Sequence, residues 1–208
     1  MAFPKLKVKV RNEVVTLGAG RFNVAEETAK ELPVSDLKKW YENDEDFVVL
    51  DLRNDYEIAS GKFEKTIDPG LANFRDLPSK IKDLEYLKNK KVVTVCTGGI
   101  RCEKATCLLK KEGFKDVYQL KDGIHTYMQE YPGQDFKGKL FVFDNRMLTD
   151  VVDVPEDKRV VIGKCVFCDT TSETYYSDDR VRPSKKVICC DQCYIKNKQY
   201  LREGVTVL

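Results

Sequence analysis

The sequence predicts an α/β protein with a parallel sheet, followed by a small cysteine-rich module. Residues 47–50 and 92–95 are continuous apolar runs, which are typical of strands buried on both faces of a parallel sheet. From residue 33 to residue 131, segments with helical spacing of apolar residues alternate with such runs. The cysteines fall into two groups, one at 96–107 and one at 165–193. This division indicates two modules.

Composition excludes several classes of protein. Apolar residues make up 42% of the 208 residues, enough for a core, and no apolar run has the length of about 20 residues that crosses a bilayer. The net charge of +2 gives no global argument for nucleic acid binding. The start of the chain lacks the apolar stretch of a secretory signal, so we expect a cytoplasmic protein with no membrane partner. The single histidine, His125, argues against a histidine-rich metal enzyme, which leaves sulfur as the reactive element.

The first two elements follow from two different periodicities. Residues 5–11 alternate between apolar and basic side chains, which predicts a half-buried strand with a basic outer face. That face is either a solvated sheet edge or a strip that contacts RNA. Ser35 is placed to cap the N-terminus of a helix that carries Leu37, Trp40 and Tyr41.

The later elements alternate between helix and strand up to Pro132, which ends the last predicted helix. After the strand at 47–50, the predicted elements are a short helix over 55–60 with Gly61 at its C-cap, a longer helix over 74–88 with one buried stripe, a strand at 92–95, a helix over 102–112, a strand at 117–120, a helix over 123–131, a strand or extended strap at 140–143 and a linker at 153–159.

The loop after the second buried strand has the features of an anion cradle. Cys96 stands where a parallel strand ends and a helix begins, which is the edge at which α/β sheets bind ligands. Gly98 and Gly99 allow successive backbone N–H groups to turn inward, and the helix N-terminus adds its positive end. A thiol in this position is expected to have a lowered pKa and to exist largely as thiolate.

The length of this loop limits its chemistry. Cys96 and Arg101 enclose four residues, one fewer than the loop of cysteine phosphatases, so the cradle fits a single sulfur atom or another small group. Arg101 is either a surface cation or a group that stabilises the bound anion or orients a substrate. Cys96 itself has the alternative of a buried structural thiol. Cys102 is a candidate resolving thiol, whereas Cys107 is expected in the core.

Several motifs together resemble a rhodanese-homology domain over residues 33–131. They are Asp51-Leu52-Arg53, Glu57 with Gly61, the six-residue loop, and Leu120-Lys-Asp-Gly-Ile. The string Cys96-Thr-Gly-Gly-Ile-Arg-Cys-Glu-Lys104, with Phe141-Val-Phe-Asp-Asn-Arg146 and the later paired cysteines, closely resembles the rhodanese-like tRNA uridine(34) hydroxylases. Members of that family convert the wobble uridine of certain tRNAs to 5-hydroxyuridine with molecular oxygen.

The resemblance assigns roles to residues of the loop and of the preceding strand. It implies that Cys96 is the catalytic cysteine, that Arg101 with Thr97, Gly98, Gly99 and Ile100 forms its cradle, and that Asp51 and Arg53 brace the active-site side of the sheet. The family usually carries a ferredoxin-like domain before the basic strand, and this sequence begins almost at that strand; we expect either a truncated start or a lineage without that domain. Asp122 also stands where rhodanese domains usually have glycine.

The C-terminal cysteines have the spacing of a metal site. Cys165-x2-Cys168 and Cys190-x2-Cys193 are separated by 21 residues, as in zinc ribbons with four cysteine ligands. A structural Zn²⁺ would stabilise a segment that has little core of its own. Disulfides or free thiols in a disordered tail are the alternatives. Cys189 could replace Cys190 as a ligand, but the two-residue spacing between Cys190 and Cys193 favours Cys190.

The same segment is rich in basic and aromatic residues. Seven basic residues lie there with only Asp191 between them as an acid, although Asp178 and Asp179 lie close by. Cations with interleaved tyrosines suit contact with RNA, and plain surface solvation is the alternative. The residues concerned are Arg180, Arg182, Lys185, Lys186, Lys196, Lys198 and Arg202, with Tyr175, Tyr176, Tyr194 and Tyr200.

Together these features predict a rhodanese-like parallel sheet with helices on both faces and a zinc-ribbon-like module. The predicted divisions are a basic strand and connector at 1–32, a catalytic domain at 33–135, a strap and linker at 136–160 and a zinc-binding module at 161–208. The predicted function is oxygen-dependent 5-hydroxylation of tRNA wobble uridine, with structural Zn²⁺ and no evident organic cofactor. The partner is tRNA, and no DNA is expected. The alternative is a sulfurtransferase that carries a persulfide on Cys96, and a non-catalytic binding module is disfavoured because the cradle is intact.

Overall fold

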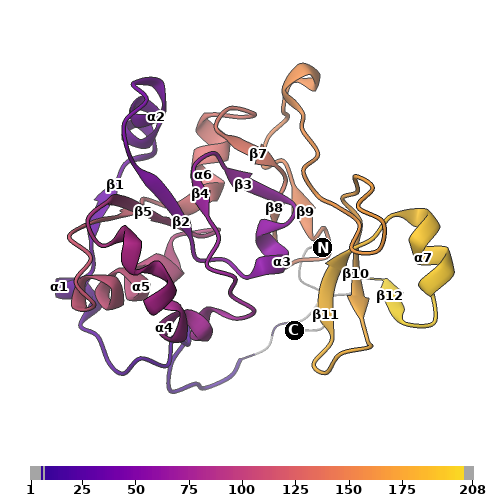
Figure 1. Ribbon diagram of the computed structural model, residues 1–208, viewed down its shortest axis with the longest axis horizontal. Helices are drawn as coiled ribbons and strands as arrows, with labels where there is room; N and C mark the ends of the chain where they lie inside the picture. Colours follow the sequence, from indigo (N-terminus) through magenta and orange to yellow (C-terminus); the bar gives the residue numbers. More distant parts are fainter. Residues whose placement is uncertain (1–5, 7, 204–208) are drawn as a thin grey trace.

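A five-stranded parallel sheet forms the centre of the larger domain in the computed structural model, which describes residues 6 and 8–203. The strand order is β1-β6-β5-β2-β4, and every neighbouring pair is parallel (Figure 1). The strands are β1 (Lys30–Leu32), β2 (Val48–Asp51), β4 (Thr66–Ile67), β5 (Lys91–Val95) and β6 (Asp116–Leu120).

Helices cover both faces of this sheet, as the sequence predicts. Alternate residues of β5 point to opposite faces, so Val92 packs into one apolar cluster and Val93 into the other. The first cluster includes residues of α4 (Leu77–Lys80) and α5 (Ile100–Lys111), and the second includes residues of α2 (Val34–Glu42) and α6 (Gly123–Glu130). The predicted fold class is therefore confirmed. The remaining short helices of this domain are α1 (Val24–Glu27) and α3 (Asp55–Ile58).

The helix predicted over residues 74–88 is divided into three short pieces. They are η1 (Phe74–Asp76), α4 and η2 (Lys82–Leu87), of which η1 and η2 are 3-10 helices. Pro78 lies in the first turn of α4, where its missing N–H group is tolerated. Ile81, Leu84 and Leu87 are buried as predicted, but their spacing of three residues is the period of a 3-10 helix.

Two predictions near the N-terminus are wrong. Residue 6 and residues 8–11 form no strand; Leu6, Val8 and Val10 are all more than four-fifths exposed. The rest of the predicted strand lies outside the described residues. None of the described strands pairs with this segment, and a strand that pairs with no other is not stable on its own. Helix α2 begins at Val34, two residues earlier than a Ser35 cap allows, because Pro33 occupies the N-cap position.

Gly61 serves in a strand and not as a helix cap. It begins β3 (Gly61–Phe63), which pairs antiparallel with β7 (Phe136–Gly138). A Cβ at Gly61 would lie 2.3 Å from the carbonyl oxygen of Lys139, so only glycine allows this close approach.

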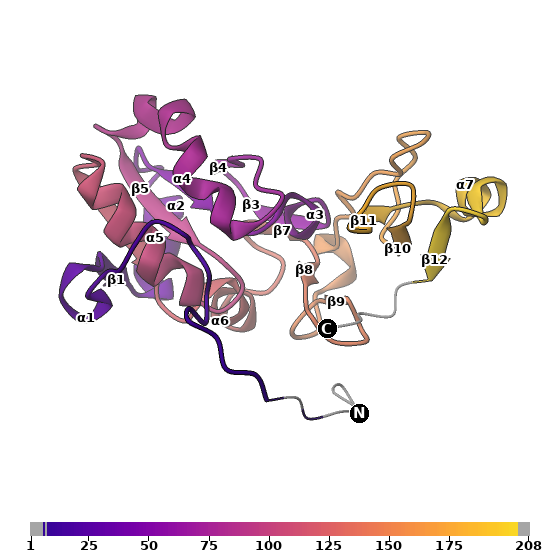
Figure 2. The same ribbon diagram turned by 90° about the horizontal axis from the view of Figure 1, so that it is seen from below.

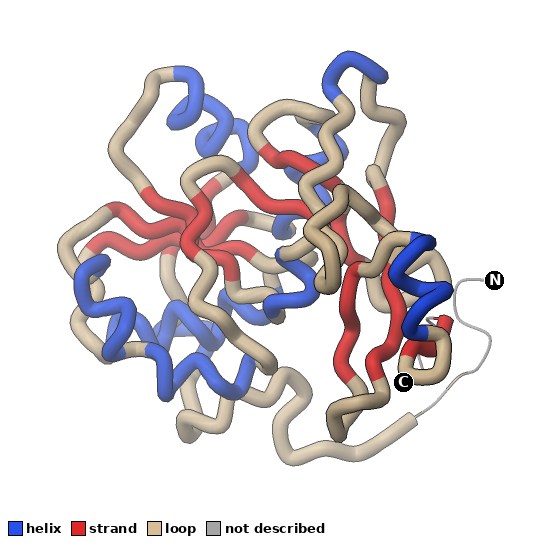
Figure 3. The backbone as a smooth tube through the Cα atoms, turned by 45° about the vertical axis from the view of Figure 1, so that its right-hand side comes forward, coloured by secondary structure: helices blue, strands red, loops and turns tan. Residues whose placement is uncertain are grey.

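The C-terminal module is a small antiparallel sheet beside the main one (Figure 3). Its order is β11-β10-β12, and the helix α7 (Asp191–Asn197) precedes β12. A hairpin of β8 (Leu140–Phe141) and β9 (Leu148–Thr149) lies between the two parts of the chain, where a strand or strap is predicted (Figure 2). The strands of the module are β10 (Tyr175–Asp178), β11 (Lys185–Ile188) and β12 (Leu201–Glu203), and the short 3-10 helix η3 (Glu156–Lys158) falls within the predicted linker.

The module docks on helix α3 of the larger domain. The Tyr175 hydroxyl donates a hydrogen bond of 2.5 Å to the backbone oxygen of Tyr56, and the Lys185 ammonium lies 2.7 Å from the Asp55 carboxylate. The rings of Tyr56 and Tyr175 both pack edge-on against Phe141. In the part of the chain that the structure describes, no helix is both long and apolar enough to span a bilayer.

Candidate active site

Cys96 lies at the carboxyl end of β5 and is almost completely buried. Its exposed fraction is 1%, whereas Gly98 and Ile100 on the outer side of the loop are exposed. Gly99 has a φ angle of +84°, which turns the chain into the first residue of α5, Ile100. The helix thus begins two residues earlier than predicted, and Ile100 and Arg101 belong to its first turn. The positive end of α5 therefore lies directly behind the cysteine.

The loop environment favours the thiolate of Cys96. A hydrogen bond from the Cys102 thiol lowers the pKa of Cys96 to about 6 despite burial, with help from backbone N–H groups of the loop and the Arg101 charge. Burial raises the pKa of Cys102, so Cys102 stays protonated and acts as the donor. Cys96 is therefore mostly ionised at neutral pH, which is the state needed for a nucleophile.

The N-terminus of α6 fixes the shape of this loop from the other side. The N–H group of Ile124 donates to the Cys96 carbonyl and that of His125 donates to the Thr97 carbonyl, both at 3.0 Å. A Cβ at Gly123 would lie 2.7 Å from the Cys96 and Thr97 carbonyl oxygens, so this contact requires glycine. Asp122 adopts a left-handed φ of +56°, a conformation that aspartate tolerates in place of the usual glycine.

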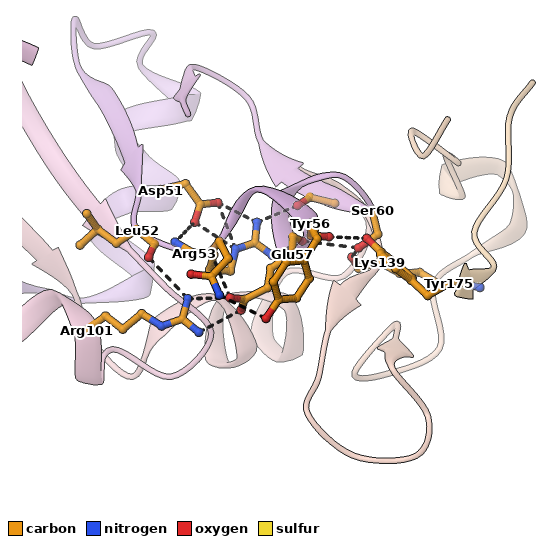
Figure 4. A network of polar contacts seen from close by, with 11 residues as sticks. Asp51, Leu52, Arg53, Tyr56, Glu57, Ser60, Arg101, Lys139 and Tyr175 are labelled. Carbon is orange, nitrogen blue, oxygen red and sulfur yellow. Dashed lines mark hydrogen bonds and ion pairs between the residues drawn. The ribbon is translucent and has the colours of Figure 1, made fainter. Parts of the chain in front are cut away.

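Arg101 is paired inside the protein. Its two terminal nitrogens lie 2.9 and 3.0 Å from the two carboxylate oxygens of Glu57, and one of them reaches the Leu52 carbonyl at 3.4 Å (Figure 4). Glu57 is fully buried and Arg101 is 14% exposed in its side chain. The interpretation of Arg101 as a surface cation is therefore wrong. The sequence marks Glu57 as part of the rhodanese pattern, but nothing in it identifies Arg101 as the partner.

Asp51 and Arg53 form a buried ion pair below this contact. Two nitrogens of Arg53 donate to the Asp51 carboxylate, the shorter bond being 2.6 Å, and both side chains have no exposed surface. Arg53 also donates to the backbone oxygens of Glu57 and Gly61 (Figure 4). It therefore connects the end of β2 with helix α3 and with the start of β3. The geometry is that of a brace.

Thr97 leaves one polar atom of the loop without a partner. Its Oγ1 is buried and has no hydrogen-bond partner among the described residues. Thr97 directly follows Cys96, so its hydroxyl and the backbone N–H groups of the loop are the polar groups closest in sequence to the reactive sulfur. Cys107, which the sequence places in the core, is 3% exposed.

The C-terminal cysteines form a second candidate site. The sulfur atoms of Cys165, Cys168, Cys190 and Cys193 all lie within 4.8 Å of one another, and Cys168 and Cys190 are 3.6 Å apart. Tetrahedral coordination with bonds of about 2.3 Å places sulfurs about 3.8 Å apart, so this group could hold a metal ion. Cys189 is not in the group. It is fully buried, its thiol faces the Cys190 carbonyl, and burial raises its pKa to about 12.

The basic and aromatic residues of the module are largely used within it. Tyr175 and Tyr176 are buried, and Tyr176 stacks on Tyr194 with ring centroids 4.3 Å apart. Arg180 pairs with Asp178 and Arg202 with Asp179. Stacking of Tyr175 or Tyr176 on RNA is therefore excluded, because the central strand β10 directs both rings into the protein.

Known proteins match both parts of the chain. A sequence model of the rhodanese-like domain matches residues 33–130, and one described as rhodanase C-terminal matches residues 137–203. The tRNA uridine(34) hydroxylase of Wolbachia pipientis wMel is 36% identical over an alignment of 205 residues, which covers 94% of this chain and 70% of the relative. The chain belongs to the tRNA uridine(34) hydroxylase family.

Other members of the hydroxylase family show the same relation. The Prochlorococcus marinus protein is 32% identical, and the match covers 97% of this chain and 72% of the relative. The Cytophaga hutchinsonii protein is 41% identical over 92% of this chain, but the chain spans only 60% of that relative's length. The predicted family is thus confirmed, while the activity of the longer relatives is a separate question.

The buried brace of this hydroxylase-family chain should contribute strongly to stability. Replacing Asp51→Asn leaves the Arg53 charge buried without its counter-ion, which costs about 3–5 kcal/mol of unfolding free energy. Urea unfolding followed by the fluorescence of the single tryptophan, Trp40, measures this loss. The matched control is Asp144→Asn, because Arg146 makes the same contacts to Asp144 but is 61% exposed and stays hydrated. Equal losses in the two variants would contradict the assignment.

The Cys102 hydrogen bond should set the acidity of Cys96. The rate of Cys96 alkylation, followed by mass spectrometry of its peptide, is expected to rise with pH around a midpoint of about 6. In Cys102→Ala the midpoint moves up toward the ordinary thiol value of about 8.5, because the thiolate loses its main donor. Cys107→Ala serves as the control and keeps the midpoint. An unshifted midpoint in Cys102→Ala would rule out this role.

Proposed function

We propose that this protein catalyses 5-hydroxylation of the wobble uridine of tRNA, with Cys96 as the catalytic residue and molecular oxygen as co-substrate: one oxygen atom becomes the C5 hydroxyl, and the other leaves as water with two protons and two electrons from an external reductant. The observation that carries the proposal is a buried cysteine at the start of α5, in a loop that lowers its pKa, within a chain of the tRNA uridine(34) hydroxylase family. A tRNA substrate places the activity in the cytoplasm. Oxygen enters the proposal through the family, because the hydroxyl at C5 is an added oxygen atom.

The surrounding residues have distinct roles in this proposal. The backbone of Thr97, Gly98, Gly99 and Ile100 surrounds the Cys96 sulfur and stabilises negative charge on it. Arg101 is a positioning residue whose charge favours the thiolate while its contact with Glu57 anchors the start of α5. Asp51 and Arg53 act only as a brace. Cys102 is the hydrogen-bond donor and remains the candidate resolving thiol.

A sulfurtransferase is the second candidate, and the size of the cradle favours it. Four residues separate Cys96 from Arg101, and the cysteine is 1% exposed, so the site suits one additional sulfur atom better than a large group. In this alternative a Cys96 persulfide passes its outer sulfur to an acceptor. Both candidates need the same thiolate, so the decision depends on the acceptor.

Nucleoside analysis of cellular tRNA tests the leading proposal. A strain that lacks this protein is complemented with the wild type, Cys96→Ala or Cys107→Ala, and its tRNA is digested and analysed by mass spectrometry. We expect 5-hydroxyuridine derivatives with the wild type and with Cys107→Ala, and a loss of at least tenfold with Cys96→Ala, because the nucleophile is gone. Unchanged derivatives in the deletion strain and in Cys96→Ala would refute the hydroxylase.

The same purified variants separate the two candidates. Rapid formation of thiocyanate from thiosulfate and cyanide, lost in Cys96→Ala, together with unchanged tRNA, would favour the sulfurtransferase. Slow or absent thiocyanate formation together with altered tRNA would favour the hydroxylase.

We also propose that the four clustered cysteines bind one structural Zn²⁺ and that residues 161–208 form a separate module, after a catalytic domain at 33–135 and a strap at 136–160. The mutual approach of the sulfur atoms to within 4.8 Å supports the metal. The metal would stabilise the short strands that carry Tyr175 and Lys185 to helix α3.

The metal content of the purified protein tests the proposed zinc site. Purified protein is expected to contain about one equivalent of zinc by elemental analysis, as one tetrahedral site with four cysteine ligands requires. Cys168→Ser should lose the metal and lower the melting temperature, because one ligand is missing. Cys189→Ser is the matched control and should retain the metal. Retention of zinc in Cys168→Ser, or its loss in Cys189→Ser, would show that the ligand set is different.

A further inference from the structure

The turn between β8 and β9 lies beside the reactive loop. The Val142 N–H group donates to the Met147 carbonyl at 2.8 Å, and the Met147 N–H group donates to the Asp144 carbonyl at 3.1 Å, which closes the turn. The Phe143 ring faces the Arg101 guanidinium, whose carbon is 5.8 Å from the ring centroid. This turn therefore contacts the residue that anchors the Cys96 cradle, and Figure 2 shows β8 next to α3.

Arg146, at the exposed side of this turn, is held in one orientation. Its backbone N–H and its Nε both lie 2.9 Å from one carboxylate oxygen of Asp144, and a terminal nitrogen lies 2.5 Å from the other. The Asp144 side chain is 5% exposed, and the hydrogen bonds from Arg146 hold the pKa of this carboxyl below its usual value. The carboxylate thus stays charged, and the arginine loses little further freedom when it binds a ligand.

The same aspartate–arginine arrangement occurs twice more, but there the arginine serves the fold. The remaining N–H groups of Arg53 donate to two backbone carbonyls, and its side chain is fully buried. The Arg180 guanidinium lies over the Phe167 ring, 4.9 Å from its centroid. Among the described residues, the Arg146 side chain donates to Asp144 alone, and 61% of it is exposed. Its outer donors therefore face solvent, on a turn whose Phe143 contacts Arg101.

We propose that Arg146 is a positioning residue that binds a phosphate of the tRNA next to the base presented to Cys96. A fixed guanidinium is the side chain best suited to bind phosphate through two parallel hydrogen bonds. Phe143 is three residues away and touches Arg101, so the Cα atoms of Phe143 and Arg146 lie within about 11 Å of each other. This inference rests on the proposed tRNA substrate.

Binding of unmodified tRNA to the full chain at several salt concentrations tests the inference. Arg146→Ala should weaken binding about tenfold at moderate salt, because a charge-assisted contact is lost. It should also reduce the slope of log affinity against log salt by about 0.7–0.9, the share of one phosphate. Arg146→Lys keeps the charge without the fork and should recover only part of the affinity. Lys111→Ala, at the far end of α5, removes an equal charge and should change neither quantity.

The outcomes separate this inference from the proposed function. Wild-type affinity and slope in Arg146→Ala, with tRNA modification still dependent on Cys96, would overturn the role of Arg146 and leave the hydroxylase standing. If the wild-type protein fails to bind tRNA, both proposals fall. The Cys96 alkylation midpoint should be unchanged in Arg146→Ala, and the unfolding midpoint should fall only slightly, because the Asp144 carboxylate loses its partner. A lowered unfolding midpoint that accounts for the weaker binding would show that the pair only stabilises the turn, which also overturns the inference.

Discussion

The buried contact between Glu57 and Arg101 is the interaction on which the reactive loop depends. The Glu57 carboxylate has no exposed surface, accepts two hydrogen-bonded contacts from Arg101 and also accepts the backbone N–H of Asn54. A buried charge is tolerated only when it has this number of partners, because its desolvation is costly. The contact therefore fixes helix α3 and the first turn of α5 together, and the Cys96 loop is the segment held between β5 and that turn.

Helix α3 also connects the loop with the cysteine-rich module. It has only four residues, so it has little stability of its own and takes its conformation from tertiary contacts. Tyr175 and Lys185 of the module contact Tyr56 and Asp55, the neighbours of Glu57. A folded module therefore supports the same helix that holds Arg101. A Zn²⁺ bound by the four clustered cysteines, as proposed, would therefore support this helix from a separate part of the chain.

Local patterns in the sequence were sufficient for much of the fold. The apolar runs at β2 and β5 identify buried strands because a parallel sheet leaves such residues no polar surroundings. The predictions failed where a pattern needs a partner that the sequence does not show. The alternation at residues 5–11 is that of a strand, but none of the described strands pairs with residue 6 or residues 8–11. The stripe at 74–88 is buried, but Pro78 and the three-residue spacing divide the helix.

The sequence by itself determined the positions of the reactive thiol and of the four clustered cysteines, since both depend on short spacings along the chain. Gly98 and Gly99 after Cys96, and the paired Cys-x2-Cys knuckles, carry that information within a few residues. Only the tertiary structure decided that Arg101 is neutralised by Glu57, 44 residues away, and that Arg146 is held by Asp144 with its outer donors free. The physical reason is that the hydrogen-bond donors available to a ligand are those that remain after the folded chain has paired its own buried groups.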